Sequence, residues 1–147
     1  MSQKPAVRFS HLALCTSDIE RSLTFYTEAL GFVLAQSIEA LGPPFDALME
    51  LPGTTCSVRQ LTCGDVMLEL ISFPATEVEG QAERGPMNQR GLTHITLSVD
   101  DIDAVAAQVV QYGGSVHEET RIESPFGPIL FCTDPDGVRI ELIQPAG

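Results

Sequence analysis

The segment LTHITLSVDDID at residues 92–103 repeats a pattern that the chain has already used at residues 9–20, as FSHLALCTSDIE. When His11 is aligned with His94, the surrounding residues match in type without a gap. The further matching pairs are Leu14 with Leu97, Asp18 with Asp101, Ile19 with Ile102 and Gly31 with Gly114. Self-similarity at a fixed offset indicates a duplicated structural unit, so it decides the fold before any single element is considered.

A second pair of similar segments lies near the end of each copy. VMLELIS at residues 66–72 resembles VRIELIQ at residues 138–144, and this aligns Glu69 with Glu141. The chain is therefore predicted to consist of two copies of one module. Each module offers one histidine and one glutamate at matching places.

Composition and charge limit the possible partners. The chain has 147 residues, of which 44% are hydrophobic, and this is enough to bury the core of a single domain at residues 1–147. Twenty acidic residues against eight basic ones give a net charge of −12. This charge repels nucleic acids and anionic lipids, so neither a nucleic acid nor a membrane is expected as a partner.

The sequence also predicts a compartment. The N-terminal segment MSQKPAVRF lacks the apolar stretch of a signal peptide, and no run of about 18 apolar residues is present to span a membrane. No C-x-x-C pair occurs, and the cysteines are too few to suggest a disulfide framework. We expect a cytoplasmic protein with reduced thiols at Cys15, Cys56, Cys63 and Cys132.

The first copy is predicted to form a strand, a helix and three further strands. Alternating apolar and polar residues predict the first strand at residues 7–15. Asp18 or Ser17 can cap the next helix, whose apolar residues recur at helical spacing up to a stop at Gly31. Three more strands are predicted at 32–38, 54–63 and 66–73. A loop is predicted at 39–54, and a hairpin turn at 63–65.

The second copy repeats this plan after a polar, irregular linker at residues 74–91. Its predicted elements are a strand at 92–99, a helix from Ile102 to Gly113-Gly114, and strands at 115–122, 128–134 and 138–144. The sequence thus predicts an α+β protein of two βαβββ modules, at residues 7–73 and 92–145. Short strands with one helix per module favour a mixed or antiparallel sheet whose outer face the helices cover.

The repeated histidines and glutamates suggest a metal site. A histidine early on the first strand and a glutamate late on the fourth can meet if those strands adjoin in one curved sheet. Two modules related by pseudo-symmetry would bring two histidines and two glutamates together. This set suits a divalent cation and leaves two octahedral positions for water or substrate, and nickel, cobalt, zinc, iron or manganese would all fit.

Simpler interpretations compete with this one. A single histidine on a strand is usually a core or surface residue, and a single glutamate on a terminal strand is usually solvated. However, apolar neighbours surround both Glu69 and Glu141, where an unpaired carboxylate would be costly, and the arrangement occurs twice. His117, in the polar segment HEET, has no counterpart and is predicted to be a surface residue.

Four segments carry a resemblance to a known family. They are SHLALCTSDIERSLTFYTEALGF, LELI, GLTHITLSVDDID and DPDGVRIELI. Together they resemble the vicinal oxygen chelate superfamily, which includes glyoxalase I, methylmalonyl-CoA epimerase, extradiol dioxygenases and bleomycin-binding proteins. The resemblance implies two βαβββ modules forming a cup-shaped sheet around one metal ion, with His11, Glu69, His94 and Glu141 as ligands.

The resemblance also implies a class of chemistry. A set of two histidines and two glutamates is that of glyoxalase I and, with substitution, of the epimerase, and both remove a proton next to a carbonyl group. The implied function is an isomerase, epimerase or lyase that enolises a small carbonyl substrate, with Glu141 or Glu69 as the base. The alternatives are an iron-dependent dioxygenase and a non-enzymatic protein that binds a drug or another ligand.

At several positions this chain lacks the substrate-binding or catalytic residues of the enzymes that it resembles. Bacterial glyoxalase I binds glutathione carboxylates partly through an arginine and an asparagine, whose places here are held by Cys15 and Phe73. Glutathione dependence is therefore doubtful on the sequence. The base of methylmalonyl-CoA epimerase falls on Ala47, with Glu50 on the opposite alternation, and its residues before the last strand are replaced by residues 133–136. Epimerases of cyclitols such as 2-epi-5-epi-valiolone need neither a thiol nor a CoA site.

Substrate pocket and assembly are predicted only in outline. Phe73, Phe126 and Met87 are candidates to line the pocket, whose specificity would lie in the loops at 39–54, 74–91 and 119–128. A homodimer is expected. The linker is long enough for the two modules to pair within one chain or between two chains, so both arrangements stay open.

Overall fold

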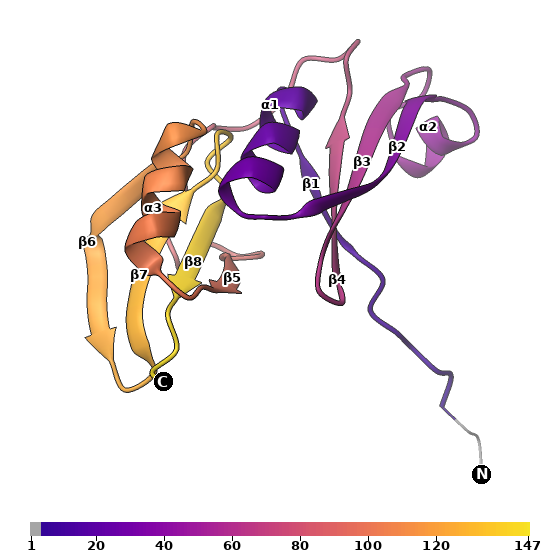
Figure 1. Ribbon diagram of the computed structural model, residues 1–147. Helices are drawn as coiled ribbons and strands as arrows, with labels where there is room; N and C mark the ends of the chain where they lie inside the picture. The colour runs from indigo at the N-terminus through magenta and orange to yellow at the C-terminus, as the bar shows by residue number, and fades with distance from the viewer. Residues whose placement is uncertain (1–3) are drawn as a thin grey trace.

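The structure is a computed structural model and describes residues 4–147. It contains two four-stranded sheets, one per module, with strand orders β1-β4-β3-β2 and β5-β8-β7-β6 (Figure 1). The elements are β1 Leu12–Cys15, α1 Ile19–Thr24, the π-helix η1 Phe25–Ala29, β2 Val33–Leu41, α2 Phe45–Leu48, β3 Cys56–Cys63, β4 Val66–Ser72, β5 Ile95–Ser98, α3 Ile102–Gln111, β6 Ser115–Ser124, β7 Gly127–Thr133 and β8 Arg139–Ile143. The predicted α+β class and the duplicated βαβββ plan are confirmed.

Both sheets are mixed in the same way. The first strand of each module runs parallel to the last one, while the remaining neighbours are antiparallel. The parallel register places Ala13 opposite Glu69 in the first module and Thr96 opposite Glu141 in the second. The first and last strands of each module therefore adjoin in one sheet, as predicted, and β1 and β5 are edge strands that do not pair with each other.

The helix boundaries follow from capping side chains and glycines. The Asp18 carboxylate accepts a hydrogen bond from the Arg21 amide at 3.0 Å, and that of Asp101 accepts one from the Ala104 amide at 2.9 Å. The first helix widens into one π-helical turn before the chain leaves it at Gly31, whose φ of 72° is the left-handed conformation that glycine adopts most easily. Of the two residues predicted as possible caps of the first helix, Asp18 is the one that caps it, and the predicted stop at Gly31 is confirmed.

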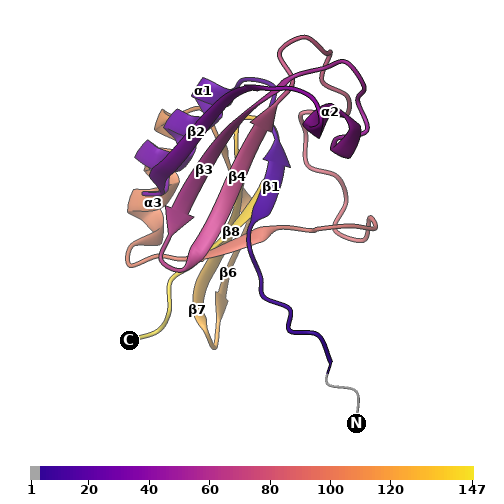
Figure 2. The same ribbon diagram turned by 90° about the vertical axis from the view of Figure 1, so that its right-hand side faces the viewer.

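One hydrophobic core joins the two modules. It contains side chains of both helices and of the inner faces of both sheets, including Phe25, Val109, Leu70 and Leu142, each 0% exposed. Helix α3 contacts the π-helical turn, and Figures 1 and 2 show the helices side by side where the sheets meet. Each helix covers one face of the sheet of its own module, and that covered face contributes its apolar side chains to the shared core.

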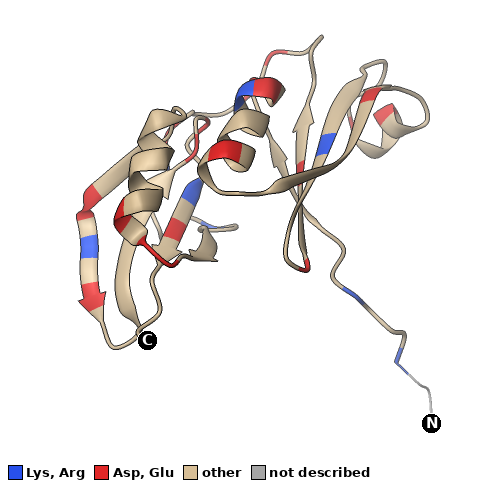
Figure 3. Cartoon of the chain, in the orientation of Figure 1, with Lys and Arg blue, Asp and Glu red and all other residues tan. Residues whose placement is uncertain are grey.

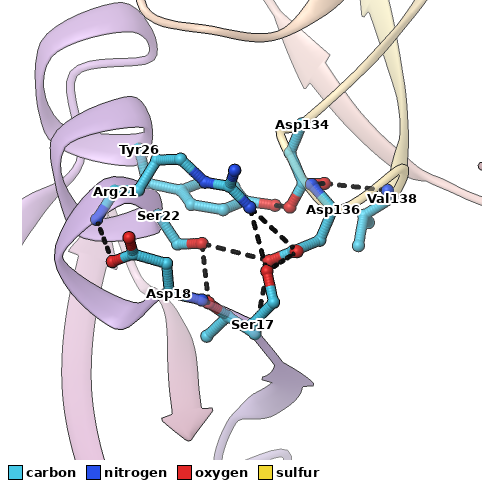
Figure 4. Close-up of polar contacts among 9 residues, drawn as sticks. Ser17, Asp18, Arg21, Ser22, Tyr26, Asp134, Asp136 and Val138 are labelled. Atoms are coloured by element: carbon cyan, nitrogen blue, oxygen red, sulfur yellow. Dashed lines mark hydrogen bonds and ion pairs between the residues drawn. The ribbon is translucent and has the colours of Figure 1, made fainter. Parts of the chain in front are cut away.

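A polar contact holds the modules in this arrangement (Figure 4). The Tyr26 hydroxyl donates to the Asp134 carboxylate at 2.9 Å, and both side chains are buried. Asp136 accepts from the Ser17 amide at 3.1 Å, from the Ser17 hydroxyl, and from Arg21 at 3.2 Å. The turn between β7 and β8 is therefore also the point where the second module binds the first helix. Burial raises the pKa of Asp134 above its ordinary value.

Two segments differ from their predictions for identifiable reasons. The predicted strand at 7–15 begins only at Leu12. Its partner β4 begins at Val66, opposite Ser10, so residues 7–9 have no strand beside them. The predicted loop after residue 38 contains a longer β2 and the short helix α2, and the Asp46 carboxylate closes the following turn by accepting from the Gly53 amide at 2.9 Å.

Two further features of the structure are the distribution of its charged residues and the length of its helices. The net charge of the chain is −12, and Figure 3 shows that acidic residues lie on both modules. Within residues 4–147 no helix has the length and apolar character needed to cross a membrane.

Candidate metal centre

Each module places one histidine beside one glutamate on the sheet face that points away from the core. Glu69 alternates with the buried Leu68 and Leu70, so its side chain leaves the sheet on the opposite face. The same alternation with Ile140 and Leu142 directs Glu141 outward in the second module. His11 Nε2 lies 3.8 Å from Glu69 Oε1, and His94 Nε2 lies 3.8 Å from Glu141 Oε2. Both predicted pairs form.

The distances within each pair suit a shared ion. Protein nitrogen and oxygen ligands lie about 2.0–2.2 Å from zinc, so a single ion can contact two atoms that are 3.8 Å apart. Imidazole nitrogen with carboxylate oxygen is also a donor set that divalent transition metals accept. The residues present therefore fit a metal ion, with two ligands per module.

The four predicted ligands do not all meet within one chain. Nowhere in the described part of the chain do three or more histidine, cysteine, aspartate or glutamate side chains lie close enough to hold one ion. The reason is the packing of the modules, since each pair lies on its own sheet and the two sheets do not join. Each module thus carries half of the predicted ligand set, here called a half-site, and the four-ligand site stays a prediction.

A hydroxyl group lies beside each histidine ring. Ser10 Oγ is 2.9 Å from His11 Nδ1, and Thr93 Oγ1 is 2.9 Å from His94 Nδ1. These contacts occupy one nitrogen of each ring and leave Nε2 directed at the glutamate. Neither hydroxyl residue was predicted as a neighbour of the histidine ring, although FSH and LTH each place one directly before the histidine.

Each carboxylate is also held by its second oxygen. Gln60 Nε2 donates to Glu69 Oε2 at 2.9 Å, and Thr96 Oγ1 donates to Glu141 Oε1 at 3.2 Å. In both half-sites the remaining oxygen is the one that faces the histidine. Neither donor was predicted, because pairing across strands depends on a register that a single sequence does not state.

An apolar wall flanks the first half-site. Val58 and Ile71 are opposite each other and lie two positions along from Gln60 and Glu69, so they share the face of the half-site. They form a small buried cluster with Cys56, against which Ile38, Leu41, Met49 and Phe73 pack. Burial, with the nearby Glu69 carboxylate as a lesser cause, raises the pKa of the Cys56 thiol.

The predicted pocket residues have different surroundings. Phe73 packs against the apolar wall, as a lining residue would. Phe126, in the β6–β7 turn, is 71% exposed, and Met87, between the modules, is 46% exposed. Only Phe73 is therefore in contact with side chains next to a half-site, and the roles of Phe126 and Met87 stay predictions.

A cavity of about 350 Å³ borders the second half-site at His94. The segment between the modules forms one of its sides, and Arg139 of β8 fixes that segment by donating to the carbonyl oxygens of Gly85 at 2.6 Å and Thr93 at 3.3 Å. The guanidinium of Arg139 also lies 5.7 Å from the centre of the Phe131 ring. The path of the predicted linker is thus fixed by the strand that carries Glu141.

His117 belongs to neither half-site. It was predicted to be a surface residue, but its side chain is only 20% exposed. Its ring lies 3.2 Å from the Thr133 hydroxyl on the neighbouring strand. Burial first, and then the positive charge of Arg84, lower the pKa of His117.

Comparison with known proteins gives the family. The sequence profile of the Glyoxalase/Bleomycin resistance protein/Dioxygenase superfamily matches residues 8–142. The chain belongs to this superfamily. This is the family that the repeated histidine and glutamate segments resemble, so the prediction from those segments is confirmed.

Several relatives are enzymes of the kinds that the sequence suggested. A lactoylglutathione lyase of Pseudomonas putida is 30% identical, with 93% of this chain and 84% of the relative covered. A lactoylglutathione lyase of Salmonella typhimurium is 30% identical, with coverages of 94% and 93%. A 2-epi-5-epi-valiolone epimerase of Actinomyces sp is 31% identical, with coverages of 97% and 82%. These similarities support lyase or isomerase chemistry of this superfamily.

Solved structures agree with the fold. A glyoxalase family protein of Bacillus cereus is similar with a TM-score of 0.87 at 16% identity, covering 100% of this chain and 99% of that one. The trypanothione-dependent glyoxalase I of Leishmania major has a TM-score of 0.66 at 24% identity, with coverages of 95% and 87%. At these identities the likeness establishes the shared fold alone.

Proposed function

We propose that this protein is a metal-dependent isomerase, epimerase or lyase that enolises a small carbonyl substrate. The proposed ligands of the divalent ion are His11, Glu69, His94 and Glu141. The single observation that carries the proposal is that each module directs one imidazole nitrogen and one carboxylate oxygen at each other, 3.8 Å apart, on the sheet face that points away from the core. Relatives named as lyases and as an epimerase support it.

The complete site, in this proposal, lies between two copies of the chain. One copy supplies the half-site of His11 and Glu69, and the other supplies that of His94 and Glu141. Two features support this arrangement. The half-sites are apart within one chain, and each lies next to a sheet edge, β1 or β5, that pairs with no further strand in residues 4–147. A symmetric homodimer would then contain two equivalent sites.

The chemistry follows from the groups that meet there. A divalent ion, when bound, supplies a Lewis acid for the negative charge that develops on a carbonyl oxygen during enolisation. A carboxylate of Glu69 or Glu141 accepts the proton from the neighbouring carbon. The wall of Val58, Ile71 and Met49 excludes water from the first half-site, which strengthens the electrostatic interactions there.

The surroundings of the first half-site bear on the substrate. Cys15 lies two residues beyond Ala13 on β1, on the same face as His11, and its thiol is exposed. Phe73 belongs to the apolar wall. Neither a thiol nor a phenyl ring binds a carboxylate, so the proposal does not include glutathione contacts at these two places. A small carbonyl compound without a peptide portion is the proposed substrate class.

Two measurements test the proposed function. Elemental analysis of the purified protein should find one divalent ion per chain, and Glu69→Ala should remove most of it, whereas His117→Ala should not. Proton NMR in deuterium oxide should then detect exchange at the carbon next to the carbonyl group when candidate ketones are added to metal-loaded protein. The proposal is wrong if no stoichiometric divalent ion is found or if Glu69→Ala leaves the metal content unchanged.

The same samples separate the rival functions. Oxygen uptake with a catechol and ferrous iron would indicate a dioxygenase. A rise in melting temperature with an apolar drug, without turnover of any carbonyl compound, would indicate a binding protein. Either result in place of proton exchange would replace the proposed function.

A further inference from the structure

The two half-sites differ in the residue that holds the carboxylate. On the inner neighbouring strand, Gln60 lies opposite Glu69, whereas Phe131 lies opposite Glu141. On the edge strand the difference is reversed, since Ala13 lies opposite Glu69 and Thr96 opposite Glu141. The duplicated modules therefore keep the ligands but exchange the position of the hydrogen-bond donor.

Gln60, the donor in the first half-site, holds its glutamate more tightly than Thr96 does in the second. The Gln60 amide is 2.9 Å from Glu69 Oε2, compared with 3.2 Å from the Thr96 hydroxyl to Glu141 Oε1. The Glu69 side chain is 11% exposed, compared with 22% for Glu141. Gln60 also lies on β3, which has a paired strand on each side, whereas Thr96 lies on the edge strand β5. Glu69 is thus fixed more firmly than its counterpart.

We propose that Gln60 is a positioning residue that fixes Glu69 so that only Oε1 faces His11 Nε2 and a divalent ion. This inference rests on the proposed function. Because the amide of Gln60 binds Oε2, Oε1 is the oxygen left to face an ion, and the hydrogen bond restrains rotation of the carboxylate. Metal binding then loses less conformational entropy in ordering this side chain.

The chemistry of an amide suits this role. A glutamine donates an N–H group without carrying charge, so it orients the carboxylate and leaves its full negative charge for a cation. A lysine or arginine at position 60 would neutralise that charge and compete with the ion. Hydrogen bonds to metal-binding carboxylates from such neighbouring groups are worth about 10- to 100-fold in metal affinity.

The test is a calorimetric titration of metal-free, full-length protein with Ni²⁺ or Zn²⁺. Gln60→Met keeps the length of the side chain and removes the donor, and it should raise Kd about 10- to 100-fold. The matched control is Thr62→Val, which changes a polar residue two positions along on the same strand and face, and it should leave Kd unchanged. Thr96→Val should raise Kd by less than Gln60→Met.

Further readouts separate positioning from a defect in folding. Thermal unfolding of metal-free Gln60→Met should match that of Thr62→Val, and the visible absorption of the Co²⁺-loaded protein should change in Gln60→Met and not in Thr62→Val. Gln60→Leu is a second variant without a donor, and it should agree with Gln60→Met. A wild-type Kd in both variants overturns this inference and leaves the proposed function standing. If the wild-type protein binds neither ion, the proposed function fails and this inference fails with it.

Discussion

Complementation between two inactive variants tests the shared site directly. One variant, His11→Ala with Glu69→Ala, lacks the first half-site, and the other, His94→Ala with Glu141→Ala, lacks the second. If each site combines half-sites from two copies, every site in either pure variant has two ligands left instead of four. Both pure variants should therefore bind little metal and show no proton exchange.

Mixing the two variants should restore a fixed fraction of the sites. After unfolding and refolding an equimolar mixture, random pairing makes about half of the dimers mixed. In a mixed dimer one site has all four ligands and the other has none. About a quarter of the wild-type metal content and of the wild-type exchange activity should return.

The assay is elemental analysis of the dimer fraction from gel filtration, which should elute at twice the chain mass of 15.9 kDa. The control is each variant refolded alone in the same way. If the site were built within one chain, no pairing could restore it, and the mixture would bind as little metal as its components. That result would refute the shared site, while stoichiometric metal in the wild-type protein would still support the ligand set.

Three further predictions concern the rest of the chain. Tyr26→Phe should lower the free energy of unfolding by about 1–3 kcal/mol in urea titrations, because the buried Asp134 carboxylate loses the Tyr26 hydroxyl and keeps only the backbone amides of Asp136 and Val138 as donors. The pKa of His117 lies below its ordinary 6.5, so the neutral ring stabilises the fold fully above that pH and this stability is lost as the pH falls below it. His117→Gln should therefore flatten the pH dependence of the melting temperature between about pH 7 and 5. In native protein a thiol reagent should modify the exposed Cys15 and Cys63, and the other two cysteines only after unfolding.

Each of these predictions has its own control. Tyr112 is the second tyrosine and is partly exposed, so Tyr112→Phe should change the unfolding free energy by less than about 0.5 kcal/mol. Equal losses in both tyrosine variants would contradict the role given to the contact with Asp134. An unchanged pH profile in His117→Gln would contradict the second prediction. For the thiols, burial raises the pKa of Cys132 to about 12, so rapid native modification of this residue would contradict the packing described.

The sequence allowed the structure of each module to be predicted, but not the way in which the two modules pack against each other. The pairs His11 with Glu69 and His94 with Glu141 were predictable, because alternation along strands and a repeated order of elements are local properties. The separation of the pairs was not predictable. It depends on contacts between residues more than a hundred positions apart, such as that of Tyr26 with Asp134.

The boundaries of the strands could not be predicted accurately either, because they also depend on contacts between distant segments. Residues 7–9 alternate as a strand would, but a strand also needs a partner, and β4 begins only opposite Ser10. The donors Gln60 and Thr96 were unpredictable for a related reason. Which residue lies opposite a glutamate depends on strand order and register, and a single sequence fixes neither with certainty.

The two open sheet edges make the state of the protein depend on its concentration. Strands β1 and β5 each have four residues and leave backbone groups unpaired along one side, and each edge lies beside a half-site. On the proposed arrangement, dilution below the dissociation constant of the dimer would expose both edges and dismantle both sites in one step. Activity per chain would then fall on dilution and return on concentration, so enzyme assays at nanomolar protein would underestimate the turnover of the assembled form.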